Sequence, residues 1–533
     1  GLLVATQVVA DLPRISYDKD GLNGHILLEP RRTNLVTYSE DFTNYYTFGA
    51  SLAYDASIIA PDGTAGVWQL LSDEASTPHY MRPINSQNNY EFLWGEQYVF
   101  SVYVKANVHD HVRLMIQTAG GGGASGTASV YAGAYYDLVN NKIPAGGQVV
   151  RTLNAVIEDV GGGWKRCSLK GTFNLTNAGT FKMSGTINGQ LDAGESTTVV
   201  LDESMNFGTI NDNATLTAGC KMYTNTGANP TLIGTVTNIS GTSVTLAAAN
   251  AVECVDGATI YFSTLGGIRI QIAGNLATGP GYGNKKPAAG GCYFWGVQFE
   301  KGNFITSYIP TLAGSTATRV AELLNGSGNS SLITNTEGVL YAEIANFGRR
   351  TNIKSHISLS NLTADSVNDS VVIGFNATND DDGDLPGKFY AGIEEGGGDK
   401  ATWSGTDASD GVALNGSVTY STSGADPYFG FLTPVYHKVA LQYKTGDSKL
   451  YINGSDVGAA TTGNITSSFT FSPILDSLAG SQRAGGATNP FYGRIKCIAY
   501  FDEVLTDDEL EALTGDSYNS FSELVAANGY TIQ

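Results

Sequence analysis

The sequence is short of positive charge, and this shortage excludes two classes of partner. Lys and Arg number 30 against 50 Asp and Glu, so the formal net charge is −20 and the sequence pI is near 4.6. A surface this acidic repels phosphate backbones and lacks the basic face of a peripheral membrane helix. We therefore expect no nucleic-acid binding and no membrane insertion, and solubility is the simplest reason for the acidity.

Cysteine and long apolar runs are also scarce. The five cysteines include no C-x-x-C pair, and their odd number predicts neither a zinc site nor a disulfide framework. Buried free thiols in a protein assembled in a reducing cytoplasm explain them better. No apolar run approaches the ~20 residues of a membrane span, and helical patterns are almost absent before the C-terminal end.

What the chain has instead is glycine, tyrosine and phenylalanine, at 66, 28 and 21 residues. Short apolar runs alternate with Gly, Asn, Ser and Thr, which is typical of strands joined by turns. Tyr98–Val104 is apolar on both faces, as expected for a strand in the middle of a sandwich. At roughly 100–200 residues per domain, the 533 residues predict about three domains, all of them β.

Two motifs resemble the ends of a known module. Leu27–Leu35 (LLEPRRTNL) continues into Tyr38–Phe42 (YSEDF), and Phe304–Thr311 (FITSYIPT) lies far downstream. Together they resemble the opening and closing segments of a jelly-roll, carbohydrate-binding-like module of bacteriophage tail and spike proteins. Gly161–Leu169 and Tyr293–Glu300 resemble two further strands of that module. The resemblance implies one jelly-roll β-sandwich between the two motifs.

Part of the span between the motifs falls outside this resemblance. Its strands stop after Phe173 and resume at Gly267, and the stretch between is rich in Thr, Asn and Gly. Ile233–Ile239 and Ser243–Leu246 alternate with period two around a Ser-Gly-Thr turn, which predicts a hairpin. We expect an inserted small β-domain here; the alternative is a long elaborated loop, which loop-length statistics disfavour.

The C-terminal part resembles a second sandwich family. His437–Tyr443 and Lys449–Gly454 form a strand–turn–strand pattern similar to a hairpin of laminin-G-like, concanavalin-type sandwiches, and Gly493–Phe501 resembles their closing strand. Thr506, with Glu509 three residues on, forms a capping box that predicts a short helix.

The expected fold is therefore all-β: a jelly-roll β-sandwich with an inserted small β-domain, then a second laminin-G/concanavalin-like β-sandwich and a short C-terminal helix. The expected boundaries are an entry segment at 1–26, the jelly roll at 27–175 and 265–312, the inserted domain at 176–264, a linker at 313–336, the second sandwich at 337–516 and a tail at 517–533.

The sequence offers no catalytic set. Gly515-Asp516-Ser517 resembles the nucleophile motif of some esterases, but the residues after Ser517 include no His to serve as its base. A helix C-cap and turn is the better interpretation, and we expect no enzymatic activity.

Two groups of residues are candidates for ligand binding. Sugar sites combine aromatic faces with polar groups, and the candidates for such a site are Tyr80, Asn89, Tyr90 and Trp94. For Tyr90 and Trp94, packing in a core or a subunit interface is the open alternative. The candidates for a structural calcium site, in an acidic run around a glycine, are Asp380, Asp382 and Asp384. A solvated acidic loop is the alternative there.

The function expected from these resemblances is that of a phage virion structural protein, either a tail fibre or spike or a head fibre, that attaches to a glycan on the host surface. They also imply a homotrimer that contacts other virion proteins and is assembled in the cytoplasm of a bacterial host. Two alternatives stay open. One is an accessory binding region of a polysaccharide-degrading enzyme, and the other is a decoration or assembly protein without a receptor role.

Overall fold

The computed structural model contains two compact units. One is built around residues 32–319, and the other around 320–533 together with an N-terminal segment that includes residues 14–31. The residues that the structure describes are 14–17, 24–72, 78–83, 90–93, 96–118, 130–144, 147, 152–172, 184–206, 219–224, 231–273, 290–311, 314–322, 333–346, 355–363, 366–375, 389–395, 398–404, 436–460, 473–476, 491–518 and 521–529.

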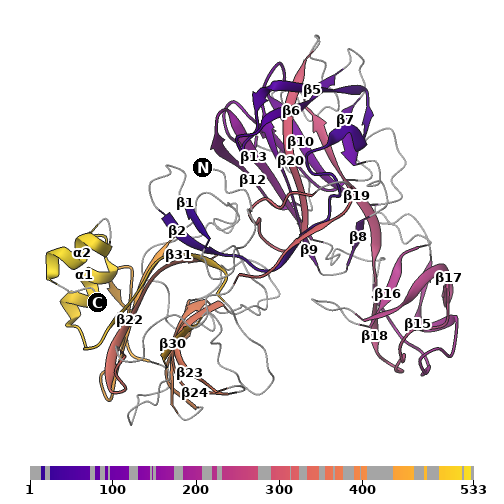
Figure 1. Ribbon diagram of the computed structural model, residues 1–533. Helices are drawn as coiled ribbons and strands as arrows, with labels where there is room; N and C mark the ends of the chain where they lie inside the picture. The colour runs from indigo at the N-terminus through magenta and orange to yellow at the C-terminus, as the bar shows by residue number, and fades with distance from the viewer. Residues whose placement is uncertain are drawn as a thin grey trace. The chain divides into compact units, whose positions relative to one another are not determined.

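The unit around residues 32–319 contains a sandwich of two antiparallel sheets (Figure 1). The first sheet, in spatial order, consists of β11 (Val130–Asp137), β10 (His111–Thr118), β19 (Thr264–Ile272), β7 (His79–Pro83) and β4 (Tyr45–Phe48), with β8 (Tyr90–Phe92) also paired to β19. The second sheet consists of β12 (Thr152–Gly161), β13 (Trp164–Thr172), β9 (Gln97–Lys105), β20 (Gly291–Lys301), β6 (Ala65–Ser72) and β5 (Ala50–Ile59).

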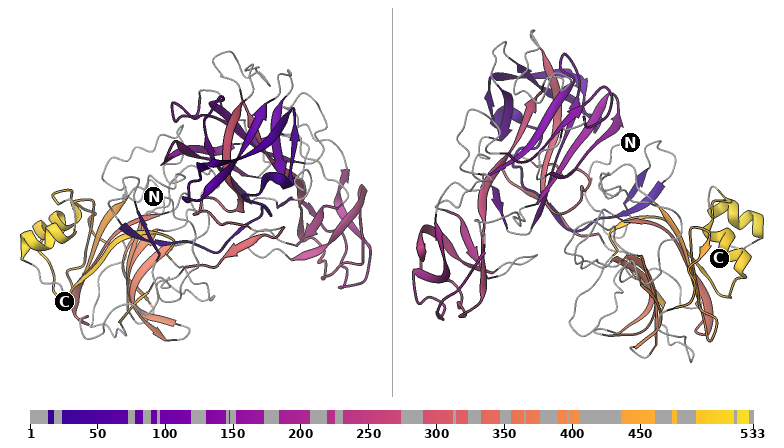
Figure 2. Two further views of the ribbon diagram at one scale, coloured as in Figure 1. Left: turned by 45° about the horizontal axis from the view of Figure 1, so that its top comes forward. Right: turned by 180° about the vertical axis from the view of Figure 1, so that it is seen from behind.

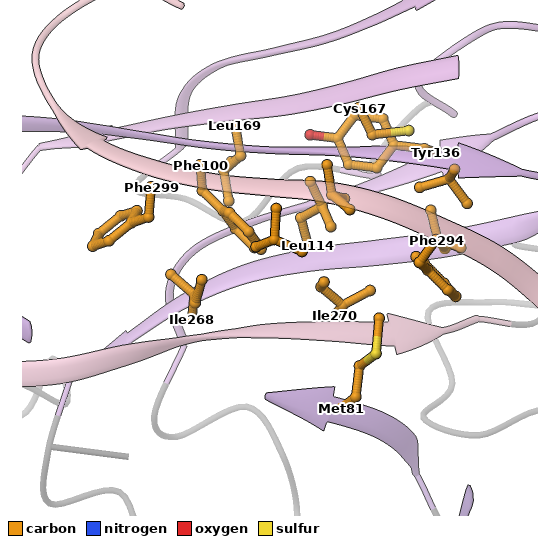
Figure 3. Packing of buried hydrophobic residues seen from close by; sticks show 14 of the residues in the cluster. Met81, Phe100, Leu114, Tyr136, Cys167, Leu169, Ile268, Ile270, Phe294 and Phe299 are labelled. Carbon is orange, nitrogen blue, oxygen red and sulfur yellow. The ribbon is translucent and has the colours of Figure 1, made fainter. Parts of the chain in front are cut away.

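The core of this sandwich lies between the two sheets (Figure 3). Leu114 and Ile270 of the first sheet belong to the same buried cluster as Phe100 and Phe299 of the second. Burial of an apolar side chain of this size contributes roughly 1.5–3 kcal/mol, so this layer holds the sheets together. Because successive residues of a strand point to opposite faces, the neighbours of these core residues must lie on the outer faces.

A second, smaller sheet is inserted into this unit. It consists of β14 (Ser184–Thr186), β18 (Thr259–Phe262), β16 (Lys221–Tyr223), β17 (Leu232–Leu246) and β15 (Thr198–Asn206). It has its own buried cluster, which includes Ile233 and Val244. The predicted hairpin is confirmed. The chain reverses within β17 at Gly241, whose φ is +60°, and Ala247 N donates to Thr235 O across the turn (2.8 Å).

The other unit is a second two-sheet sandwich. Its larger sheet consists of β1 (Ile15–Tyr17), β2 (Gly24–Leu28), β31 (Gly493–Phe501), β22 (Glu337–Asn346), β27 (His437–Lys444), β28 (Lys449–Ile452) and β29 (Ser455–Asp456). The smaller sheet consists of β26 (Gly398–Ser404), β25 (Phe389–Glu395), β24 (Ser366–Phe375), β23 (Ser355–Thr363) and β30 (Pro473–Asp476). The predicted hairpin of this unit is the β27–β28 pair.

Two short helices cover the outer face of the larger sheet, α1 (Asp507–Thr514) and α2 (Phe521–Asn528) (Figure 1, Figure 2). The predicted capping box is present, with Thr506 as the N-cap, its hydroxyl accepting from Glu509 N and the Glu509 carboxylate bonding back to Thr506 N. Leu510 and Leu513 pack in one cluster with Tyr341 of the sheet. No helix in the described part of the chain has the length and apolar character needed to cross a membrane.

The all-β fold of two sandwiches, a small inserted β-domain and a C-terminal helix is thus confirmed, but two expected boundaries are shifted. Part of the expected entry segment and the first residues of the opening motif form β2, which pairs with β31 of the second sandwich. The division between the units therefore falls at Arg31/Arg32 and not at residue 27. Part of the expected linker is also structured, because Ala317–Arg319 forms β21 and pairs with β3 (Arg32–Asn34).

Candidate functional site

The opening and closing motifs meet in the first unit around one buried amide. Asn34 Nδ2 donates to the carbonyl oxygens of Val297 (3.1 Å) and Ile309 (2.9 Å). Its Oδ1 accepts from the backbone N–H groups of Val36 and Phe299, both at 3.1 Å. These four bonds use all the hydrogen-bonding capacity of the side chain. Asn34 therefore joins the entering chain, β20 and the closing motif.

A second set of polar contacts strengthens the same junction. Ser39 N donates to Thr311 Oγ1 (3.0 Å), and Thr311 N donates to Ser39 Oγ (2.8 Å). The Tyr308 hydroxyl lies 2.7 Å from Ser39 Oγ and donates to the Glu40 carboxylate (2.8 Å). Burial raises the pKa of Glu40, and the bond from Tyr308 opposes that rise.

These contacts assign the two motifs a structural role. Asn34, Ser39 and Tyr308 are fully buried, so none of them can touch a ligand at the surface. Trp164 on β13 and Trp295 on β20 are 2% and 3% exposed and share a buried cluster with Tyr308. The recognisable part of the sequence thus closes the sandwich, and a binding surface must lie elsewhere.

The outer face of the first sheet carries a continuous row of aromatic and arginine side chains. On β4 and β7 the outward positions pair across the strands, Tyr46 with Arg82 and Phe48 with Tyr80. On the neighbouring strand β19, Gln271 pairs with Tyr80. Alternation places the intervening residues in the core, as for Met81. We call the following residues the aromatic–arginine face: Tyr46, Phe48, Tyr80, Arg82, Arg113 and Arg269.

The side chains of the aromatic–arginine face are stacked on one another. The Phe48 and Tyr80 rings are nearly parallel, with centroids 5.3 Å apart and an interplanar angle of 16°. The Arg269 guanidinium lies 3.9 Å from the Tyr80 ring centroid, and that of Arg82 lies 4.7 Å from the centroid of Tyr46. Such contacts hold both aromatic and guanidinium planes in fixed orientations.

Exposure and charge both vary across this face. Tyr46 and Phe48, on the edge strand, are 41% and 40% exposed, whereas Arg113, on β10, is 3% exposed. Tyr80, Arg82 and Arg269 are half-buried between them. The four strands β4, β7, β19 and β10 contain no Asp or Glu. In a chain of net charge −20, this face is therefore a local region of positive charge.

The electrostatics of Arg269 reflect that arrangement. Burial lowers the pKa of its guanidinium, Tyr80 opposes this shift, and the positive charges of Arg82 and Arg113 add to it. A face with exposed rings and planar cations has the chemical groups that bind a sugar by stacking and hydrogen bonding.

The structure separates the predicted sugar-binding residues. Tyr80 lies on the aromatic–arginine face. Tyr90 points the other way: its ring packs 5.0 Å from that of Phe299 against the core, and burial raises the pKa of its hydroxyl. Tyr90 is therefore a packing residue, the alternative left open above. Asn89 and Trp94 lie outside the described residues.

The calcium candidates Asp380, Asp382 and Asp384 also lie outside the described residues. Among the residues that are described, no group of three His, Cys, Asp or Glu side chains could hold a metal ion. All five cysteines are free thiols, and four of them are buried. Gly515, the first residue of the esterase-like motif, is the C-cap of α1, and its carbonyl accepts from Lys438 Nζ (2.7 Å).

Sequence reasoning missed most of the aromatic–arginine face. Tyr46, Phe48, Arg82 and Arg269 come from three strands that are far apart along the chain. A weak local signal exists in the alternation of His79–Pro83, where Tyr80 and Arg82 occupy one face. Nothing in that alternation shows which strand lies beside it.

Comparison with known proteins adds little to this picture. No family model matches the chain, and no curated protein matches it. Among solved structures, one similar chain is described as mouse laminin alpha1 chain, domains LG4-5. It has 10% sequence identity and a TM-score of 0.21, and the match covers 82% of this chain and 91% of that chain. A TM-score this low carries no argument, so the fold rests on sheet order and strand pairing alone.

Proposed function

We propose that this chain is a non-enzymatic structural protein of a bacteriophage virion, a tail fibre, tail spike or head fibre, which attaches to a glycan on the host surface. The observation that carries the attachment role is the aromatic–arginine face, where exposed rings and oriented polar groups share one side of a sheet. The phage origin is supported by the resemblance of Leu27–Leu35 and Phe304–Thr311 to the ends of a phage module.

The proposed partners are further copies of this chain and other virion proteins. A module that displays one binding face gains avidity when several copies point at the same surface, which fits a homotrimer held by other virion proteins. A decoration protein without a receptor role is the rival explanation, since exposed Tyr and Phe also mark interfaces between subunits.

Binding of the purified protein to host cells tests the proposal. We expect saturable binding that soluble host polysaccharide competes away. If the protein does not bind the cells infected by the phage from which it comes, the attachment role is refuted. A parallel assay for reducing sugar released from the polysaccharide tests the non-enzymatic part, and sustained release by the pure protein would overturn it.

A further inference from the structure

The positive charge of the aromatic–arginine face narrows the class of its ligand. Arg82 and Arg269 are both half-buried, and each guanidinium is held over a tyrosine ring. Stacking fixes the plane of a guanidinium, and its N–H donors lie in that plane at the edge.

Planar guanidinium donors are suited to planar anions. The N–H fork of arginine matches a carboxylate, or two oxygens of a phosphate or sulfate, in a two-point contact. Neutral sugars need no such charge: their hydroxyl groups are bound by amides, carboxylates and ring faces. Three neighbouring arginines repel one another. A neutral sugar would not offset this repulsion, whereas an anionic group would.

The positive charge of the aromatic–arginine face contrasts with the negative charge of the rest of the chain. The remainder of the acidic chain repels anionic polymers, while β4, β7, β19 and β10 contribute no carboxylate. Arg113 lies beneath the surface at 3% exposure, so it cannot contact a ligand and acts only through its charge. An anionic polysaccharide is therefore attracted to this face and repelled by the surface around it. This difference determines where on the protein the polysaccharide binds and in which orientation.

We propose that the aromatic–arginine face binds an acidic saccharide, with the sugar ring stacked on the exposed Phe48 ring and its anionic group paired with Arg82 and Arg269. This inference rests on the proposed glycan attachment and specifies the charge of the glycan. The anionic group can be a uronate or sialate carboxylate, a phosphate or a sulfate, because the arginine fork accepts each of them.

A glycan array with matched pairs tests the inference. Each acidic saccharide, whether it carries a uronate, sialate, phosphate or sulfate group, is printed beside a neutral counterpart in which that group is esterified, reduced or removed. We expect binding to acidic members only, with an affinity that falls as salt is raised from 50 to 300 mM, roughly the range over which surface charges become screened.

Two variants and a control connect the result to this face. Arg269→Gln and Arg82→Gln should each weaken binding by about tenfold or more, the value for loss of a charged hydrogen bond. Lys142→Gln removes one exposed positive charge from the turn after β11 and should bind like the parent protein. Circular dichroism and melting temperature confirm that each variant is folded.

The results distinguish failure of the acidic-saccharide inference from failure of the proposed glycan attachment. Equal binding of acidic and neutral partners, or unchanged binding of both arginine variants, overturns the acidic-saccharide inference and leaves glycan attachment standing. If no saccharide on the array is bound, and the host polysaccharide itself does not bind, the proposed function has failed. Self-association that disappears in the arginine variants would assign the face to a subunit interface.

Discussion

At the scale of single residues, the first sandwich depends on buried polar groups as much as on its apolar core. Asn34 makes four hydrogen bonds to three segments of the chain. A buried amide with every donor and acceptor satisfied fixes one arrangement, because any other leaves polar groups without partners. The conspicuous Asn of the opening motif is explained by this demand and needs no ligand.

Replacement of Asn34 by alanine should therefore destabilise the first sandwich. Two carbonyl and two N–H groups would lose their partner in a buried site, and we expect a loss of about 2–4 kcal/mol in the free energy of unfolding. Urea denaturation measures it. Asn44→Ala is the matched control, because the Asn44 amide bonds only to exposed groups of its own turn. Equal effects of the two substitutions would contradict the structural role of Asn34.

A buried histidine makes the second sandwich sensitive to acid. His437 is 1% exposed, and burial lowers its pKa from 6.5 to about 4. Below pH 6.5 His437 is protonated in the unfolded chain but stays neutral in the folded chain. The stability of the fold therefore falls as the pH drops from 6.5 towards 4. The full loss over that window is about 3 kcal/mol.

The measurement is the free energy of unfolding of the parent protein and of His437→Gln between pH 4 and 8. The variant starts less stable, because a buried site is altered, but its stability should depend less steeply on pH below 6.5. Parallel pH profiles for the two proteins would show that His437 is protonated in the folded state as readily as in the unfolded one.

At the scale of elements, local patterns predicted local structure well. The β27–β28 hairpin, the reversal at Gly241 and helix α1 were all predicted, since each is encoded by alternation, a turn residue or a cap within a few residues. Pairing between distant strands was not predictable in this way. The opening motif continues a strand that pairs with β31, hundreds of residues away, and a local signal cannot show its partner.

For the same reason, local sequence patterns could not predict the whole aromatic–arginine face. Tyr80 was predicted, but the residues beside it come from β4 and β19, and only the register of the sheet brings them together. For Tyr90 the sequence left two possibilities open, sugar binding and packing. The structure favours packing, because the strand turns the Tyr90 ring inwards against Phe299.

The cap of α1 gives a test at this scale. Thr506→Ala removes the hydroxyl that accepts from Glu509 N, and we expect a loss of about 1 kcal/mol together with faster amide exchange in the first turn of α1. Thr506→Ser retains a hydroxyl and should restore most of the protection. If the alanine and serine variants exchange alike, the cap does not stabilise the helix.

At the scale of the whole molecule, the two sandwiches and the inserted sheet each have a core of their own. The net charge of −20 is not spread evenly, because one sheet of the first sandwich has an outer face without carboxylates on four of its strands. The recognisable motifs close that sandwich, and the proposed binding face lies on residues that no motif includes. Substitutions in the face should therefore alter binding while the fold remains intact.

The most direct test of this account is the affinity of Tyr80→Ala for host polysaccharide, measured by isothermal titration beside Tyr54→Ala. Tyr54 is a control of the same type, 56% exposed on β5 of the other sheet. Truncation of a central aromatic residue typically costs about 2 kcal/mol of binding energy, so we predict roughly 30-fold weaker binding for Tyr80→Ala and no change for Tyr54→Ala. Unchanged affinity of a folded Tyr80→Ala protein would contradict the assignment of the binding site to this face.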